Sequence, residues 1–241
     1  FRKMLDTVVA RTNGQGIFNL DVTAGRRFGY NYFYEYGNLF LENRYTDWGK
    51  YYPHFTLRNL WMLSKYIPPQ RLQIEFLNKW RNKDKYPVKD SLSPSAYSFD
   101  YLFAITMPGQ PLAWMETRNL PAEAYSTAPL IATYKKYWKA WHDGTIFPIG
   151  QEPSGYSWTG FQSFTPGNSA EGFVLVFREN NEAAANVLKL MNLEAGKYVF
   201  EHIAGSGKSF TASITGNQTA SFTLPQKQRF AFYHYRKIKG R

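Results

Sequence analysis

The sequence predicts a chain of two fold classes, an α/β part over 1–149 followed by an all-β part over 150–241. In the first part, helical patterns alternate with short apolar runs, which is typical of helices packed on a parallel sheet. In the second part, short runs with period-two alternation are separated by Gly, Asn and Pro, which predicts an antiparallel β-sandwich. A polar bridge over 150–155 separates the two parts.

The chain opens with a helix, a glycine turn and a short strand. Four apolar residues spaced on one helix face precede the turn over 13–16, namely Phe1, Leu5, Val8 and Val9. The apolar run Ile17-Phe-Asn-Leu-Asp21 then ends in a carboxylate. In barrels of parallel strands, the residues at the carboxyl ends of strands line the active site, so Asp21 is a predicted catalytic residue. A strand-end Asp that caps the next turn explains the position equally well.

A second predicted strand, Leu39 to Leu41, leads into the densest chemical cluster of the chain. Within seven residues this cluster holds two carboxylates, an arginine, an amide and an indole: Glu42, Asn43, Arg44, Asp47 and Trp48. A sugar site needs acids for catalysis, polar groups for hydroxyls and an aromatic platform. The alternative interpretation is a structural salt-bridge corner.

Later elements of the first part are less rich in chemistry. Thr56 is predicted to cap a helix that ends near Tyr66, before two prolines. The segment 71–78 fits a strand or a helix, and 97–107 is apolar and predicted to be buried. A further short strand over 109–116 places Glu116 at its end as a weaker site candidate.

The last helix of this part carries an aromatic stripe and ends at Gly144. The stripe consists of Leu130, Tyr134, Tyr137, Trp138 and Trp141. Its spacing predicts a core-facing surface rather than a cofactor site. In the second part the predicted strands are Trp158–Phe161, Phe173–Phe177, Val187–Leu193, Tyr198–Ile203, Ala220–Leu224 and Phe230–His234.

The composition restricts the class of partner. The chain has a net charge of +11, but its Lys and Arg are spread along the sequence, so a nucleic-acid partner is not predicted. There are 18 Tyr, 19 Phe and 7 Trp, whose flat rings suit sugar faces as well as a core. Cysteine is absent, which excludes a thiol nucleophile. No apolar run reaches the ~20 residues of a membrane helix, so no membrane partner is predicted. A periplasmic or extracellular location is favoured, with the cytoplasm as the alternative.

Several segments give the chain a family resemblance. Gly109-Gln-Pro-Leu-Ala-Trp, Asn119-Leu-Pro-Ala-Glu-Ala and Gly144-Thr-Ile-Phe resemble the last barrel strand, final helix and exit of α-galactosidase-like glycoside hydrolases of clan D, nearest to family 36. Ser157-Trp-Thr-Gly-Phe and Gly172-Phe-Val-Leu-Val-Phe-Arg resemble the C-terminal sandwich of that family. The resemblance implies the second part of a (β/α)8 barrel whose first strands lie upstream of Phe1.

The resemblance also implies a retaining glycosidase that acts on α-linked glycosides without a metal or organic cofactor. Asn19-Leu-Asp21 is similar to the segment of the nucleophile, which the family has at the end of the fourth barrel strand. The family has its acid/base at the end of the sixth strand, and Asp47 is the expected acid/base, with Glu42 and Glu75 as alternatives. Ser64 is followed by Lys65, where the family pattern has Ser followed by Asp. The expected sugar contacts are Glu42, Arg44, Trp48 and Trp114.

The expected partners are an oligosaccharide or glycoside substrate, together with the missing N-terminal barrel segment or a second copy of the chain. The competing hypothesis is a carbohydrate-binding or structural fragment without turnover.

Overall fold

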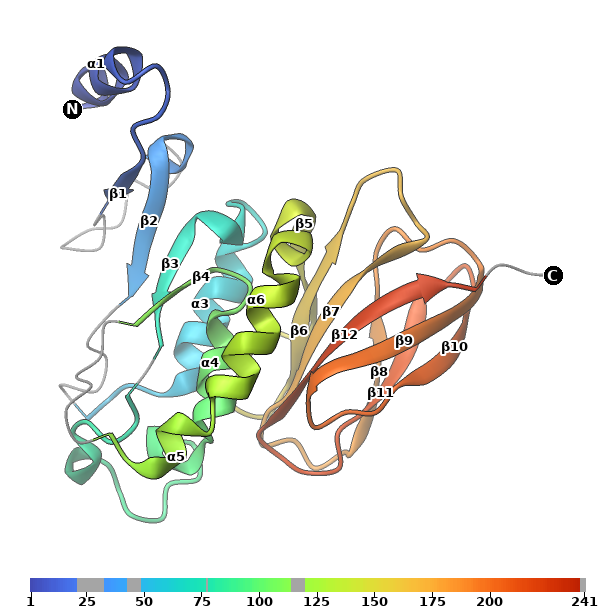
Figure 1. Cartoon of the computed structure of the whole chain (residues 1–241). Helices are drawn as coiled ribbons and strands as arrows, with labels where there is room; N and C mark the ends of the chain where they lie inside the picture. Colours follow the sequence, from blue (N-terminus) through green and yellow to red (C-terminus); the bar gives the residue numbers. More distant parts are fainter. Residues whose placement is uncertain (21–32, 43–48, 77, 114–119, 239–241) are drawn as a thin grey trace.

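The computed structural model describes residues 1–20, 33–42, 49–76, 78–113 and 120–238. A parallel sheet with its helices lies beside a group of antiparallel strands, and helix α1 stands at the far end of the sheet from the sandwich (Figure 1). The prediction of an α/β part followed by an all-β part is thereby confirmed. None of the helices found in the described ranges has the length and hydropathy needed to cross a membrane.

The first sheet has four strands, all parallel and in sequence order. These strands are β1 (Phe18–Leu20), β2 (Gly37–Glu42), β3 (Leu72–Glu75) and β4 (Gln110–Leu112). The helices are α1 (Arg2–Arg11), α3 (Pro53–Leu63), α4 (Phe99–Thr106), α5 (Ala122–Tyr125) and α6 (Ala128–Asp143). Single 3-10 turns are η1 (Tyr34–Tyr36), η3 (Pro69–Arg71), η4 (Lys83–Lys85) and η5 (Pro94–Ala96). Of the two interpretations of 71–78, the strand is correct.

Helix α3 begins four residues earlier than predicted. Pro53 occupies its first turn, where the fixed φ of proline suits a helix and the missing N–H costs nothing. The predicted cap, Thr56, lies inside the helix, where its hydroxyl is hydrogen-bonded to the hydroxyl of Tyr51 at 2.5 Å. The cap prediction was wrong because the proline signal outweighs a lone threonine.

The aromatic stripe of α6 is partly confirmed as core. Leu130, Tyr134 and Trp141 are buried. Trp138 remains 41% exposed, so its assignment to the core was wrong. The six-stranded sheet covers only part of the stripe. Trp141 packs on Phe232 of that sheet at a ring distance of 5.2 Å. Trp138 instead lines an exposed groove beside β4.

The second part is built from antiparallel strands in the order β10-β9-β12-β7-β6-β5, with β8 and β11 paired separately. The strands are β5 (Thr145–Gly150), β6 (Trp158–Phe164), β7 (Glu171–Arg178), β8 (Ala185–Lys189), β9 (Gly196–Gly205), β10 (Phe210–Ile214), β11 (Thr219–Thr223) and β12 (Arg229–Lys237). A core of its own lies between the two sheets, which gives a sandwich-like arrangement. The sequence did not predict β5 or β10.

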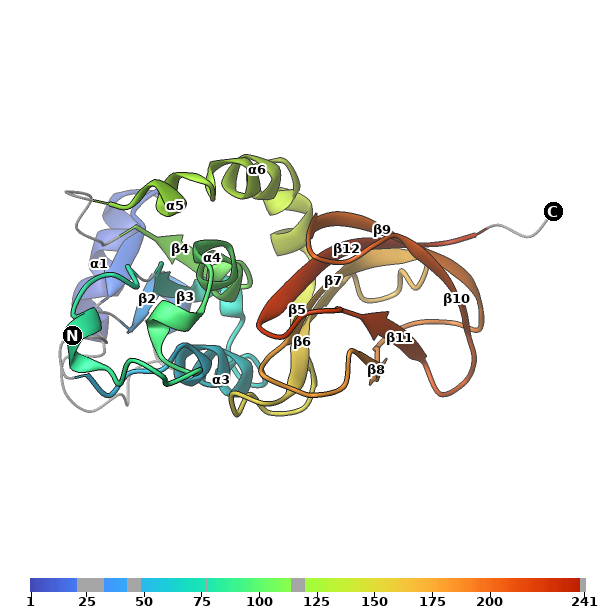
Figure 2. The same cartoon turned by 90° about the horizontal axis from the view of Figure 1, so that it is seen from below.

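A shared aromatic core joins the two parts. Trp141, Phe173 and Phe232 pack together from α6, β7 and β12, with ring distances of 5.2 to 6.3 Å. The indole N–H of Trp61 on α3 donates to the carbonyl of Ile149 on β5 at 3.0 Å. Seen from below, α3, α4 and α6 stand between the parallel sheet and the six-stranded sheet (Figure 2). Since β5 belongs to the six-stranded sheet, the predicted division after 149 falls at the end of an edge strand.

Candidate functional site

The carboxyl ends of the four parallel strands meet at one edge of the sheet, the lower edge in Figure 1. Glu42 is the last residue of β2, and Glu75 is the last residue of β3. Asp21 is the first residue after β1 in the sequence. Three neighbouring strands therefore each end in, or lead directly into, a carboxylic acid. Edges of this kind are where parallel α/β folds place their active sites.

The pleat of the strands decides which side chains share a face. Leu39, Leu41, Leu72 and Ile74 belong to the core that faces the helices. Residues that alternate with them, Phe40 on β2 and both Gln73 and Glu75 on β3, therefore lie on the opposite face. In register, Phe40 is beside Gln73, which is beside Gln110. The face away from the helices thus carries Phe40 together with the polar side chains of Gln73 and Glu75, and Glu75 lies at the acidic edge.

Two polar side chains on this face are shielded from water. Glu75 is only 8% exposed and has interaction partners within the chain. The Oε1 atom of Gln73 is shielded from solvent and accepts no hydrogen bond from the described residues. A buried acceptor without a donor carries a desolvation cost of about 1–3 kcal/mol. Such a cost is tolerated where a ligand or water supplies the missing donor.

Lys79 fixes the chain that follows β3. Its side chain is 6% exposed, and Nζ donates to the Tyr97 carbonyl at 2.7 Å and to Glu123 Oε1 at 2.6 Å. The ammonium group also lies 5.0 Å from the ring centre of Phe99. The ion pair between Lys79 and Glu123 ties the segment after β3 to α5 by a charge-assisted hydrogen bond.

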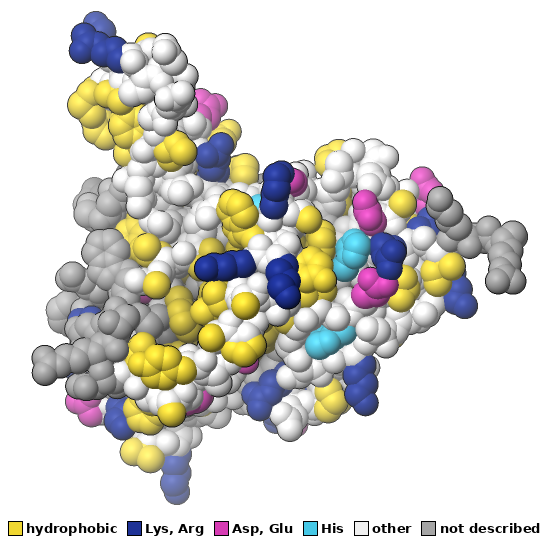
Figure 3. Space-filling model, viewed as in Figure 1, with side chains coloured by type: hydrophobic (Ala, Val, Ile, Leu, Met, Phe, Trp, Pro, Cys, Tyr) yellow, Lys and Arg dark blue, Asp and Glu magenta, His cyan; other side chains and the backbone are white. Residues whose placement is uncertain are grey.

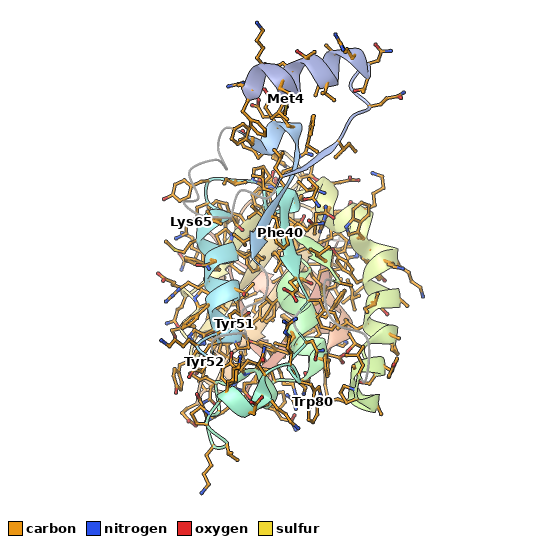
Figure 4. All side chains as sticks on the ribbon, turned by 90° about the vertical axis from the view of Figure 1, so that its left-hand side faces the viewer. Met4, Phe40, Tyr51, Tyr52, Lys65 and Trp80 are labelled. Atoms are coloured by element: carbon orange, nitrogen blue, oxygen red, sulfur yellow. The ribbon has the colours of Figure 1, made fainter. Side chains whose placement is uncertain are left out.

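Aromatic residues also gather at this end of the molecule. Figure 4 places Tyr51, Tyr52 and Trp80 towards the end opposite α1. Trp80 is 41% exposed, and Lys83 lies over its ring at 4.3 Å. A partly exposed indole is a suitable stacking surface for a sugar. Trp80 is absent from the predicted site residues, although it stands in a charged loop directly after a predicted strand.

Most predicted site residues lie outside the described residues, so their geometry stays a prediction. This applies to Asp21, Arg44, Asp47, Trp48 and Trp114, and also to the weaker candidate Glu116. Glu42 is placed at the end of β2, but its side chain is not part of the description.

The Ser64–Lys65 pair does not occupy the expected strand end. Ser64 is at the C-terminus of α3, with its hydroxyl donating to the Leu60 carbonyl at 2.6 Å. Lys65 follows it, with Nζ 3.9 Å from the ring centre of Trp61, and Figure 4 shows it towards the end nearer α1. The proposed departure from the family pattern was therefore wrong, because this pair terminates a helix and has no relation to the acid/base position.

The described part of the chain contains no group of three or more His, Asp or Glu side chains arranged to hold a metal ion. Its Lys and Arg side chains are scattered over the face seen in Figure 3 rather than gathered into a patch.

Comparisons with known proteins place the fold. No protein-family model matches the sequence, and no curated protein matches it either. Among solved structures, the family 36 α-galactosidase AgaB of Geobacillus stearothermophilus superposes with a TM-score of 0.62 at 16% identity. A variant of AgaA from the same organism, in complex with stachyose, gives 0.63 at 15% identity. Both alignments cover 98% of this chain and 30% of the other chain.

A maltogenic α-amylase, AmyB of Thermotoga neapolitana, also superposes, with a TM-score of 0.57 at 11% identity over 97% of this chain and 59% of its own. At these identities the likeness shows the fold alone. The fold is that of the C-terminal portion of family 36 α-galactosidases, as the sequence resemblance predicted, and the chain spans 30% of the length of those two enzymes.

Proposed function

We propose that this chain forms part of a glycoside hydrolase that acts on α-linked glycosides by a retaining mechanism. The observation that carries the proposal is the acidic edge of the parallel sheet, where Asp21, Glu42 and Glu75 end or follow three neighbouring strands. The likeness to family 36 α-galactosidases supports the same activity class. Stachyose and raffinose are the sugars found with AgaA variants, and α-galactosides are therefore the first substrates to test.

In the proposed mechanism, Asp21 attacks the anomeric carbon, and the bond to the leaving oxygen breaks as Asp47 donates a proton to that oxygen. Water, deprotonated by Asp47, then releases the sugar from Asp21 and restores both groups. A retaining enzyme needs the two carboxyl groups about 5 Å apart. Glu42, Arg44, Trp48 and Trp114 are proposed to hold the sugar, with Trp80 as a further stacking surface.

The strand order sharpens the assignment of Asp47. We propose that β1–β4 are the last four strands of an eight-stranded barrel, since they are parallel, in sequence order and followed by the sandwich. In this count β2 is the sixth strand, after which the resemblance expects the acid/base. Asp47 lies five residues beyond Glu42, the end of β2. Only one strand, β2, separates Asp21 from Asp47, and this agrees with the short stretch of sequence between the two residues.

The same count gives a second candidate for the role of nucleophile. The resemblance expects that residue after the fourth strand, whereas β1 is the fifth in this count. The competing assignment is therefore an acid on a strand upstream of Phe1, with Asp21 next to it as a sugar contact.

The test is covalent labelling of the full-length protein. Activity is first measured on 4-nitrophenyl α-galactoside and 4-nitrophenyl α-glucoside. An activated fluoro-glycoside of the preferred sugar then traps the glycosyl-enzyme, and mass spectrometry of the peptides locates the label. A label on Asp21 supports the proposed mechanism, and a label upstream of Phe1 supports the competing nucleophile. Absence of both turnover and label, with sugar binding retained in calorimetry, would favour the alternative of a carbohydrate-binding protein without turnover.

A further inference from the structure

A hollow lies at the junction of the two parts, between the helices α4 and α6 and the sandwich. Its volume is about 430 Å³, within the range of small-molecule sites. It is formed where the first turns of α4 and α6 meet the end of β9 and the start of β12. Figure 1 shows the lower ends of α4 and α6 beside these two strands.

The hollow has an apolar floor and a polar rim. Leu130, Ile203 and Phe230 provide most of the floor. Asp100, on α4, and Arg229, on β12, bring opposite charges to the rim, and the hydroxyls of Thr133 and Ser206 add neutral donors and acceptors. A largely apolar cavity with a few polar groups is the usual composition of a site for a small organic ligand.

Asp100 is short of a hydrogen-bond donor. Its Oδ1 atom is shielded from solvent and accepts no hydrogen bond from any residue that the structure describes. A buried carboxylate oxygen without a donor is costly. Its position in the first turn of α4 favours the negative charge. Because Oδ1 is shielded, a ligand in the hollow meets the Asp100 carboxylate through Oδ2.

Arg229 is oriented and retains donors. Its Nε donates to Gln226 Oε1 at 3.1 Å, and Nη1 donates to the Gln228 carbonyl at 3.0 Å. Nη2 makes no hydrogen bond to the described part of the chain, so the guanidinium can still donate to a ligand. Fixing two of the nitrogens in this way reduces the entropy lost when the third binds.

Gly205 keeps the wall of the hollow open. Its φ of +92° disfavours any other residue, and an added Cβ would lie 2.2 Å from the Phe230 carbonyl oxygen. The end of β9 therefore approaches β12 closely without placing a side chain between them.

We propose that this hollow binds one pyranose unit of an α-linked oligosaccharide. A sugar hydroxyl donates to the Asp100 carboxylate through Oδ2, a second sugar oxygen accepts from Arg229, and the apolar face of the ring lies on Leu130 and Phe230. In a parallel sheet the connecting helices run back against the strands, so the first turns of α4 and α6 lie towards the carboxyl ends of β1–β4. An oligosaccharide held at the acidic edge can extend in this direction. The class of ligand rests on the proposed glycosidase function.

The experiment separates the two sites in the full-length protein. Saturating 1-deoxygalactonojirimycin, which is found bound to AgaA, occupies the catalytic site, and stachyose is then titrated by calorimetry. We expect residual binding that is at least tenfold weaker in Asp100→Asn and in Arg229→Gln. The matched controls are Asp143→Asn at the other end of α6 and Arg236→Gln further along β12. Both should leave the residual stachyose binding unchanged. Turnover of 4-nitrophenyl α-galactoside should be unchanged in all four variants.

A blocking variant keeps the test valid if Asp100→Asn loses stability. Ser206 is exposed on the rim, and Ser206→Trp should cover the hollow without altering Asp100. The proposal is overturned if an active, inhibitor-saturated protein shows no residual stachyose binding, or if that binding is the same in Asp100→Asn, Arg229→Gln and Ser206→Trp. If the protein neither hydrolyses the aryl galactoside nor binds the inhibitor, the proposed function fails. In that case stachyose is titrated into the protein without inhibitor. Weaker binding in Asp100→Asn would support the hollow as a sugar site, and unchanged binding would overturn it.

Discussion

The sandwich and the parallel sheet bury the apolar faces of their strands in different ways. The sandwich buries its inner faces against each other, with Phe200, Phe222 and Tyr235 almost fully shielded from water. The parallel sheet buries one face against helices that in turn pack on the sandwich, and its other face carries Phe40, Gln73 and Glu75. The comparison teaches that the sandwich has both sheets covered, whereas the parallel sheet leaves one face and its acidic edge for the chemistry that we propose.

The largest expected effect concerns the carboxylate after β1. If Asp21 is the nucleophile, Asp21→Asn in the full-length protein should lower kcat/KM for aryl α-galactosides at least about 10³-fold, or roughly 4 kcal/mol of transition-state stabilisation. Asp143→Asn, which removes an exposed acid on α6, is the control and should be neutral. A loss of less than tenfold for Asp21→Asn would transfer the nucleophile to an upstream acid.

The next effect concerns the shared core at the junction of the two parts. Phe232 is fully buried between Trp141 and Phe173. Phe232→Ala should lower the free energy of unfolding by about 3–5 kcal/mol, because it removes a large ring and leaves a cavity. Trp138→Ala on the exposed side of α6 should cost less than about 1 kcal/mol. Equal losses in denaturant titrations of the two variants would show that the shared core does not couple the two parts.

Acid should weaken the packing around α3. Burial, with a smaller contribution from Arg58, lowers the pKa of His54 from 6.5 to about 4. The neutral imidazole is therefore favoured in the folded state, and the stability it contributes is present above pH 6.5 and lost as the pH falls towards 4. The loss should be about 3 kcal/mol. His54→Gln should show a shallower dependence over this window, and identical pH profiles for the two proteins would contradict the assignment.

The smallest effect concerns the exposed apolar side chains on and near α1. Phe1, Met4 and Ile17 are 71%, 54% and 79% exposed. Exposed apolar side chains of this kind favour association with another segment or a second copy. Changing all three to Ser should raise the monomer fraction of the 241-residue chain in sedimentation experiments, with a stability change within about 0.5 kcal/mol. Val88→Ser, at an isolated exposed position, is the control. An unchanged association constant would exclude this face.

The sequence predicted elements better than it predicted their surroundings. Period-two alternation located β11, because one face of that strand is buried. The apolar run of β12 located a central strand that is buried on both faces. It missed β10, whose Phe210 and Ala212 are only partly covered. The position of Ser64–Lys65 could not be judged, because a dipeptide does not report whether it ends a helix or a strand.

The acids at the strand ends were predictable because the chain direction fixes where parallel strands end. The hollow of Asp100 and Arg229 was not, since those residues are far apart in the sequence and meet only when the sandwich packs on α4 and α6. Local patterns identify which face of an element is buried, but not which distant element covers it.

The central claim is that the edge formed by the strand ends is a glycosidase site with Asp47 as the proton donor. The most direct test compares Asp47→Asn with the unaltered full-length protein on two aryl α-galactosides that differ in leaving group. A poor leaving group needs the proton, so phenyl α-galactoside should lose about 10²–10⁴-fold in rate. 2,4-Dinitrophenyl α-galactoside should lose much less in the glycosylation step, because its leaving group departs without a proton. Equal losses on both substrates, or no loss on either, would contradict the assignment.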